Sequence, residues 1–323
     1  MKIIEQLNKL PIRSGEYLVL PNLSTPYFIV PLHSRRTFID AISFVKSKNL
    51  KGNIKRNALK FIPIFILKRL FSVISIQAKD CDNHFHQLIL PWNQDVCNKF
   101  TVFNFNKNKI TLFKIGFKNY KGMIRNEYES ILKVPNFGKD IIPEIISFRE
   151  DESFTKIETL FYDGIHPNYL PVKINDFFER IKAESPSVKM NDHPYVNRIV
   201  KVINDVLKKE CLDILFNSVN TNLKKLENEL VSVVLMHGDC SKTNVISKNG
   251  RDMLIDWEDC IIDGVPIDIG YFDFRMFIDD GKSWKVETKI DFLVVLHYIY
   301  LQIKNDNIRS LYKISFKDSI FSL

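Results

Sequence analysis

The chain has 323 residues and a mass of 37.9 kDa, a length that fits one large domain or two small ones. Hydrophobic residues make up 45% of the chain and charged residues 26%, which excludes a disordered chain, a collagen-like rod and a disulfide-stapled miniprotein. The formal net charge is +8, and an excess of this size suggests an anionic partner such as nucleic acid, a membrane surface or a phosphorylated substrate.

The basic excess lies in the first quarter of the chain. Residues 1–90 carry 14 basic and 5 acidic side chains, so the other 233 residues sum to about −1. This distribution argues against a DNA-binding surface over the whole protein, and we expect no nucleic-acid partner. Five cysteines without a CxxC pair, and an N-terminus without an apolar signal-peptide core, predict a cytoplasmic location.

A basic stretch is followed by an apolar one in the first quarter. Residues 46–60 hold six basic side chains and no acidic one, and residues 61–76 are mostly apolar. The apolar stretch is too short to span a bilayer, and Lys68 and Arg69 in its middle would cost about 2.5–3.5 kcal/mol each at the bilayer centre. Two interpretations stay open: a solvated basic helix leading into a core segment, or peripheral contact of residues 46–76 with an anionic membrane or glycan.

From about residue 98 the pattern is that of strands. Residues 100–105 and 110–117 are rich in Phe, Ile, Val and Thr and predict a hairpin that turns at residues 106–109. A helix is predicted over residues 122–134, before Pro135. Two more strands are predicted over residues 141–148 and 154–160.

After Gly164 the pattern becomes helical. Helices are predicted over residues 174–183, 195–216, 223–230 and 292–303. The order is therefore a small antiparallel sheet that carries one helix, followed by a mostly helical half, which is typical of a two-lobed α+β protein.

The segment most informative about chemistry is residues 231–259. A buried strand over residues 233–236 leads into His237-Gly238-Asp239, and Asn244 follows the aspartate by five residues. A hairpin over residues 245–247 and 253–255 then delivers Asp256 at the end of its second strand. The hairpin makes Asn244 and Asp256 neighbours, so two carboxylates and one amide gather at its open end.

This set of side chains suits metal-assisted phosphoryl transfer. Mg²⁺ prefers oxygen ligands and keeps several waters, so one carboxylate, one amide oxygen and phosphate oxygens make a suitable shell. The remaining carboxylate, Asp239, would accept the proton of an attacking hydroxyl.

These residues resemble the signature of the aminoglycoside phosphotransferase and choline kinase superfamily, the small-molecule branch of the protein-kinase-like fold. HGDCSKTN (residues 237–244) and IDWED (residues 255–259) match both halves of that pattern in order and spacing, and residues 264–270 resemble its Gly-x-Pro-x-x-Asp-Leu segment. The resemblance covers residues 97–275. It implies a kinase-like two-lobed fold, a small-molecule acceptor, ATP with GTP as the alternative nucleotide, and Mg²⁺.

The resemblance also implies a role for each matched residue. Asp239 would be the catalytic base, and Asn244 and Asp256 would be the metal ligands. His237 and Asp268 would brace the loop by hydrogen bonds. Glu258 matches the acidic residue two after the metal aspartate, where a second ligand and a solvated carboxylate are both open.

A kinase-like site also needs a strand lysine and a helix glutamate. Strand alternation places Lys114 on an otherwise apolar face, where it needs a partner or must reach the surface. On the following helix Glu127 interrupts the inward stripe of Met123 and Ile131, whereas Glu129 lies on the outer face with Arg125. We therefore expect a Lys114–Glu127 ion pair that holds the nucleotide phosphates.

Two further nucleotide contacts follow from the resemblance. The hinge slot falls before Gly164, so the backbone of Thr159–Tyr162, with Phe161, would read the adenine edge, although Phe161 and Tyr162 could equally be core aromatics. The loop that covers the nucleotide departs from the family, because residues 95–100 contain no glycine. Cys97-Asn98 would take the place of a Ser-Asn pair, with Asn98 touching phosphate.

The predicted organisation has three parts: a basic N-terminal extension over residues 1–90, a kinase-like small lobe over residues 91–163, and a helical lobe over residues 164–323. The predicted function is transfer of the ATP γ-phosphate to a hydroxyl of a sugar or glycan precursor, an amino alcohol or an aminoglycoside. The alternative is a catalytically inert kinase-like module that docks on a membrane or an anionic glycan through its basic N-terminal region.

Overall fold

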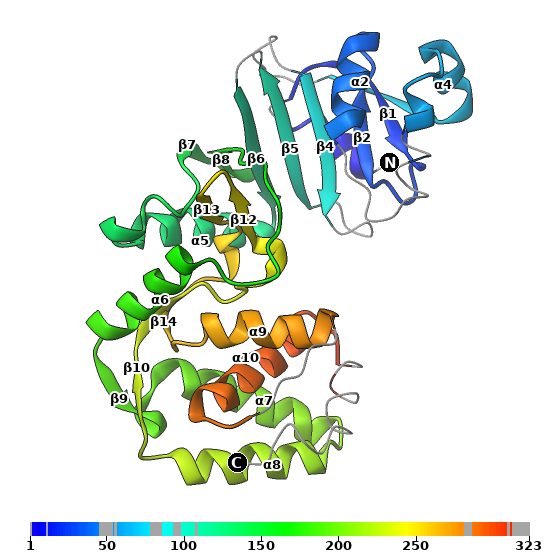
Figure 1. Cartoon of the computed structure of the whole chain (residues 1–323). Helices are drawn as coiled ribbons and strands as arrows, with labels where there is room; N and C mark the ends of the chain where they lie inside the picture. The colour runs from blue at the N-terminus through cyan, green and yellow to red at the C-terminus, as the bar shows by residue number, and fades with distance from the viewer. Residues whose placement is uncertain are drawn as a thin grey trace. The chain divides into compact units, whose positions relative to one another are not determined.

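The structure is a computed structural model that describes residues 2–10, 12–44, 54, 57–77, 86–92, 98–106, 109–280, 286–308 and 311. The chain divides into two compact units. Unit 1 comprises Met1–Tyr128 with Glu144–Phe161, and unit 2 comprises Glu129–Pro143 with Tyr162–Leu323 (Figure 1).

In the described part of unit 1, eight strands form an antiparallel sheet in the order β3-β1-β2-β4-β5-β6-β8-β7. The strands are β1 (Gly15–Leu20), β2 (Phe28–Pro31), β3 (Ser72–Ile76), β4 (His86–Trp92), β5 (Lys99–Asn106), β6 (Lys109–Phe117), β7 (Ile145–Glu150) and β8 (Phe154–Leu160). The expected hairpin of β5 and β6 is present, with Phe103 opposite Leu112. Its turn residues 107 and 108 lie outside the described residues.

Helices accompany this sheet. They are α1 (Lys2–Leu7), α2 (Arg35–Phe44), α4 (Ile64–Leu70) and the first part of α5 (Tyr120–Lys133). Helix α2 buries Phe38, Ala41 and Ile42 in an apolar cluster that also contains Leu88 of β4 and Leu67 of α4. The inward stripe predicted for residues 122–134 is the buried face of α5, since Glu127 and Ile131 are both buried and Met123 is half-buried.

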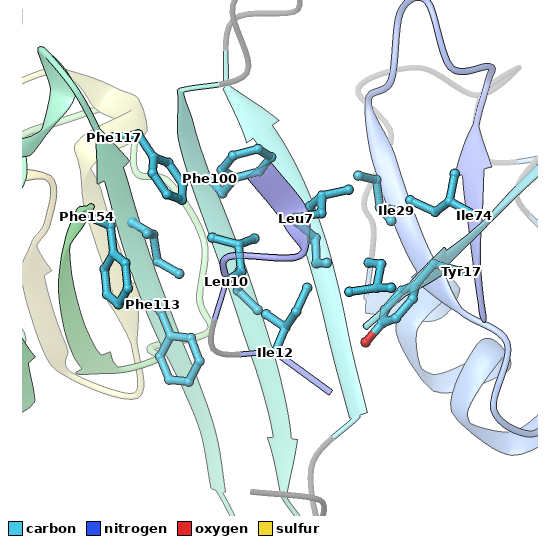
Figure 2. Close-up of a cluster of buried hydrophobic side chains, with 14 of the residues drawn as sticks. Leu7, Leu10, Ile12, Tyr17, Ile29, Ile74, Phe100, Phe113, Phe117 and Phe154 are labelled. Carbon is cyan, nitrogen blue, oxygen red and sulfur yellow. The ribbon is translucent and has the colours of Figure 1, made fainter. Parts of the chain in front are cut away.

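The N-terminal quarter is part of this sheet, which corrects the expectation of a separate extension over residues 1–90. Leu7, Leu10 and Ile12 pack in the same cluster as Phe100 and Phe113 of the hairpin (Figure 2). Strand β2 hydrogen-bonds to β4 and thereby joins β1 and β3 to the strands of the predicted small lobe. The apolar, β-branched residues of these short strands explain the pairing, since each strand gains a partner and a buried face.

Unit 2 is mostly helical. Its helices are α6 (Val172–Glu184), α7 (Pro194–Lys209), α8 (Asp213–Leu226), α9 (Asp268–Asp280) and α10 (Lys289–Lys304). Among the residues that the structure describes, three two-stranded sheets accompany them, formed by β9 (Ser187–Lys189) with β10 (Leu230–Ser232), β11 (Val234–Met236) with β14 (Ile261–Gly264), and β12 (Val245–Lys248) with β13 (Arg251–Leu254). Helix α10 is apolar along most of its length and is buried over residues 292–299.

Two predicted boundaries in unit 2 differ from the structure. The helix expected over residues 195–216 is broken between α7 and α8, where Cys211 takes a left-handed φ of 54° that a continuing helix cannot contain. The helix expected over residues 223–230 is the end of α8, and Leu230 already belongs to β10.

The apolar stretch of residues 61–76 is divided between helix α4 and strand β3. Strand β3 pairs with β1, and Ile74 and Ile76 are buried in the cluster of Figure 2. Within the described part of the chain, no helix combines the length and the apolar content that crossing a membrane requires. Most of the basic stretch of residues 46–60 lies outside the described residues.

Candidate active site

The loop after β11 presents Asp239. Strand β11 ends at Met236, and the chain turns through buried His237 and through Gly238, whose φ is +85°. A Cβ at Gly238 would lie 2.2 Å from the carbonyl oxygen of Asp259, so only glycine fits this close approach of two backbone segments. The next side chain, Asp239, is 29% exposed.

Two side chains hold the backbone of this loop. The buried carboxylate of Asp268, the first residue of α9, accepts hydrogen bonds from the N–H of His237 at 3.0 Å and from that of Gly238 at 3.2 Å. The His237 ring donates from Nε2 to the carbonyl oxygen of Ile255 at 3.0 Å, so its Nδ1 is left to accept from the N–H of Asp239. The structure thus places both predicted bracing residues in contact with the loop.

A third support comes from α10. His297 is fully buried, and its Nε2 lies 2.6 Å from the carbonyl oxygen of Gly238. Because a carbonyl can only accept, Nε2 carries the proton, and Nδ1 accepts from the hydroxyl of Tyr195 at 2.5 Å. Burial lowers the pKa of His297 to about 4, so the ring is neutral near pH 7.

Replacing His297 with glutamine is expected to change the slope of stability against pH between about pH 6.5 and 4, because it removes a loss of stability that sets in as the pH falls. The folded-state pKa of about 4 lies below the unfolded value of 6.5, so this group destabilises the fold as pH falls from about 6.5 to 4, by about 3 kcal/mol in total. Asp239 and Asp268, whose pKa values burial raises to about 7, act in the opposite sense over this range. The measurement is therefore the difference in unfolding free energy between wild type and variant at each pH, and equal slopes would contradict the assignment.

The Asp239 carboxylate is held at both of its oxygens. The amide nitrogen of Asn244 donates to Oδ2 at 3.0 Å and to the backbone carbonyl of Asp239 at 2.9 Å. The guanidinium of Arg275, on α9, lies 3.3 Å from Oδ1. Burial raises the pKa of Asp239 to about 7, which the positive charge of Arg275 opposes.

The hairpin of β12 and β13 places Asp256 beside Asn244. Val245 pairs with Leu254, and the N–H of Ile255 donates to the carbonyl of Asn244 at 2.9 Å. Asn249 and Gly250 form the turn with φ values of 51° and 75°, the sign that a two-residue type I′ hairpin requires. Asp256 itself has φ 67° and ψ 60°, a left-handed conformation that costs free energy and is common at functional sites.

Gly250→Ala is expected to destabilise unit 2 by about 1 kcal/mol, because alanine must adopt the positive φ of the turn. Apart from the two chain neighbours, no atom of the described residues lies within 4 Å of the added Cβ, so the cost comes from the backbone alone. The matched control is Gly122→Ala in helix α5, where the added Cβ is equally unobstructed and alanine should stabilise by about 0.5–1 kcal/mol. Thermal unfolding measures both changes, and shifts of the same sign would contradict the assigned turn.

The donor atoms of Asn244 and Asp256 fit a hard divalent cation. Asp239 takes both hydrogen bonds that the Asn244 amide nitrogen donates, which leaves the Oδ1 end of the amide as an oxygen ligand. Asp256 adds a half-buried carboxylate one residue beyond Ile255. Glu258 is half-buried in the following 3₁₀ turn (Trp257–Asp259). One amide and one carboxylate are the donor types that Mg²⁺ takes alongside phosphate oxygens and water.

Unit 1 holds the predicted ion pair. The ammonium of Lys114 on β6 lies 2.7 and 2.8 Å from the two carboxylate oxygens of Glu127 on α5. The two side chains are only 10% and 3% exposed. Replacing a buried ion pair by packed apolar residues is often neutral or stabilising, so stability alone gives little reason for this pair.

The other residues expected at the nucleotide lie in different environments. The Asn98 side chain is buried and accepts a hydrogen bond from Gln6 at 2.7 Å. Thr159 is a buried residue of β8. The ring of Phe161 packs edge-on against Phe103, and its N–H donates to the carbonyl of Ile110. Phe161 is therefore a packed aromatic in this structure. Residues 95–97 of the expected covering loop lie outside the described residues.

Arg275 and His297 were missed by the sequence analysis. Arg275 lies seven residues after Asp268, so two helical turns return it to the same face of α9, a spacing that could have revealed it. His297 is a polar residue in the middle of the apolar run of residues 292–301, where a buried side chain needs hydrogen-bond partners. Both residues act on the loop that carries Asp239.

Comparisons found no matching protein-family model and no matching curated sequence, but solved structures match. The choline kinase LicA from Streptococcus pneumoniae is 13% identical with a TM-score of 0.45, over 71% of this chain and 92% of that one. A thermostable mutant of aminoglycoside phosphotransferase APH(4)-Ia is 14% identical with a TM-score of 0.44, over 72% and 91%. Spectinomycin phosphotransferase APH(9)-Ia, in complex with ADP and spectinomycin, is 11% identical with a TM-score of 0.44, over 72% and 85%.

These solved structures come from the superfamily that the motifs of residues 237–270 resemble. At such low identity, and with TM-scores below 0.5, the likeness is distant. The candidate site therefore rests on the contacts of this chain's own residues.

Proposed function

We propose that the protein is a phosphotransferase that moves the γ-phosphate of ATP, or alternatively of GTP, to a hydroxyl of a small molecule. The observation that carries the proposal is the arrangement in unit 2: Asp239 held through Oδ2 by Asn244, with Asp256 next to Asn244 across the hairpin. A carboxylate base beside an amide and a second carboxylate is the set that kinase-type phosphoryl transfer uses.

In the proposed reaction Asp239 accepts the proton of the acceptor hydroxyl. The acceptor oxygen forms a bond to the γ-phosphorus, the bond from that phosphorus to the bridging oxygen breaks, and ADP leaves with the electron pair. Asn244 and Asp256 would hold Mg²⁺, which neutralises charge on the phosphates when bound. Asn244 has a second task, because its amide nitrogen fixes the orientation of the Asp239 carboxylate.

Lys114 would hold the nucleotide phosphates, with Glu127 fixing the direction of its ammonium group. Two short contacts to one carboxylate orient the ammonium more strictly than a single contact would. A buried ion pair contributes little net free energy to folding, so a role in binding explains this pair better than a role in stability. The backbone of Thr159–Tyr162 would contact the adenine, and Asn98 the phosphates.

The acceptor belongs to one of three classes: a sugar or glycan precursor, an amino alcohol, or an aminoglycoside. Arg275 favours a sugar or glycan precursor, because its guanidinium lies 3.3 Å from the Asp239 carboxylate, which the acceptor hydroxyl must approach. An ammonium group next to that hydroxyl would meet a positive charge, although Asp279 partly neutralises it at 3.0 Å from the guanidinium.

A Mg-ATP titration followed by thermal unfolding tests nucleotide binding. A ligand at about 100 times its Kd stabilises the folded state by about 2.7 kcal/mol, so the unfolding temperature should rise by several degrees. Mg²⁺ without nucleotide is the control. No rise at millimolar Mg-ATP would contradict the proposal and favour the catalytically inert module, for which the glycine-free covering loop is the main argument.

A further inference from the structure

Unit 1 exposes large apolar side chains at and just before helix α4. Phe61 is 83% exposed and Phe65 is 62% exposed. Phe65, Lys68 and Arg69 are three and four residues apart on the helix, so they share one face, and Phe61 precedes Phe65 by four residues. All four are exposed. We call Phe61, Phe65, Lys68 and Arg69 the α4 surface.

The fold holds this surface firmly in place. Leu67, which lies two residues from both Phe65 and Arg69, is fully buried in the apolar cluster with Phe38 of α2. The guanidinium of Arg35 donates to the backbone carbonyls of Lys60 and Ile62, on both sides of Phe61. Helix α4 also packs on β3, the edge strand of the sheet. The two phenylalanines are therefore exposed on a segment whose backbone is held in place by packing and hydrogen bonds.

The charge around the two phenylalanines is positive. Lys68 forms an ion pair with Glu16, whereas the Arg69 guanidinium makes no ion pair or hydrogen bond within the described part of the chain. The sequence that leads into the helix, residues 46–60, adds six basic side chains and no acidic one. Residues 1–90 carry a net charge of +9, and the rest of the chain is close to neutral.

We propose that the α4 surface docks on an anionic lipid bilayer, with Phe61 and Phe65 entering the interface and Lys68 and Arg69 at the headgroups. Aromatic side chains beside basic ones are the combination that binds such interfaces, through apolar burial and attraction to acidic lipids. A neutral apolar partner would not need the charge, and an anionic polymer such as nucleic acid or a glycan would not need two exposed phenylalanines. The contact would bring the protein to a membrane surface.

Vesicle flotation of the full-length protein tests this proposal. The vesicles are phosphatidylcholine alone or phosphatidylcholine with phosphatidylglycerol, at about 0.1 M and about 1 M salt, where the Debye length falls from about 10 to 3 Å. The protein should float with the anionic vesicles at low salt and remain in solution with neutral vesicles or at high salt. Flotation requires no nucleotide and no turnover, so its result is independent of the proposed phosphotransferase activity.

The variants separate the apolar and the charged contributions. Phe61→Ser with Phe65→Ser should lower partitioning at least tenfold, and Arg69→Gln should lower it about fivefold. The matched control is Val172→Ser with Ile214→Ser, which removes two equally exposed apolar side chains from unit 2 and should leave partitioning unchanged. Thermal unfolding checks that all variants fold, as expected for exposed positions.

Three results would overturn the proposal: absence of the wild-type protein from the anionic vesicle fraction, equal flotation of the double phenylalanine variant, or equal loss with the unit 2 control. Self-association that the phenylalanine substitutions abolish, without vesicle binding, would assign the same surface to a second copy of the chain. Sedimentation velocity of the same proteins measures that outcome.

Discussion

Asp239→Asn is expected to lower kcat for phosphoryl transfer by about 10²–10⁴-fold while leaving the stabilisation by Mg-ATP largely intact. Asparagine keeps the size of the side chain but cannot accept the hydroxyl proton, and general-base catalysis contributes about this factor. The proposed metal ligands, Asn244 and Asp256, are unchanged, so nucleotide binding should survive. ADP release measures turnover, and the thermal shift measures binding.

The matched control for this variant is Asp252→Asn. Asp252 is also half-buried and lies on the neighbouring strand β13, where its carboxylate accepts a hydrogen bond from Ser247 at 2.6 Å. This substitution removes a carboxylate from the same hairpin but none from the proposed site, so kcat should stay near the wild-type value. Full turnover in Asp239→Asn would contradict the assignment of Asp239 as the catalytic base.

Lys114→Met is expected to lower kcat/KM for ATP by about 10²–10³-fold, the usual effect of removing one preorganised donor from a charged transition state. It should also destabilise the fold by about 3–5 kcal/mol, because Glu127 keeps a buried charge without its partner. The single variant therefore mixes two effects, and loss of activity alone would not show that the lysine contacts nucleotide.

The double variant Lys114→Met with Glu127→Leu separates them. Exchanging both charges for apolar side chains of similar size should restore most of the lost stability, since the desolvation of two ions is no longer required. Activity should stay as low as in the single variant if the ammonium binds phosphate. Recovery of both stability and activity in the double variant would mean that the pair is structural.

Much of the sheet and of the hairpins after residue 98 could be predicted from local pattern. Runs of apolar and β-branched residues predicted β5, β6 and β8, and the runs at residues 245–247 and 253–255 predicted the β12–β13 hairpin. The extra strands β1, β2 and β3 were missed because they are only four to six residues long and widely separated in the sequence. Which strand pairs with which is decided by long-range contacts, and the many basic residues between these short apolar runs obscure the strand pattern.

Residues of the site could be predicted where a charged side chain interrupts a periodic apolar pattern. Glu127 interrupts an apolar helical stripe and Lys114 an apolar strand face, so each needed a partner, and the structure brings them together. Arg275 gave a weaker signal, because an arginine on a half-exposed helix face is common. The tautomer of His297 could not be read from the sequence, since it depends on Tyr195 and Gly238, which are distant along the chain.

The most direct measurement is phosphorus NMR of the full-length protein incubated with Mg-ATP and a panel of hydroxyl acceptors: sugars, amino alcohols and aminoglycosides. The proposal predicts that ATP is converted to ADP and that a phosphate monoester of at least one acceptor forms, at a rate that Asp239→Asn reduces at least 10²-fold. Formation of no ester with any acceptor, together with no thermal shift from Mg-ATP, would contradict the phosphotransferase assignment.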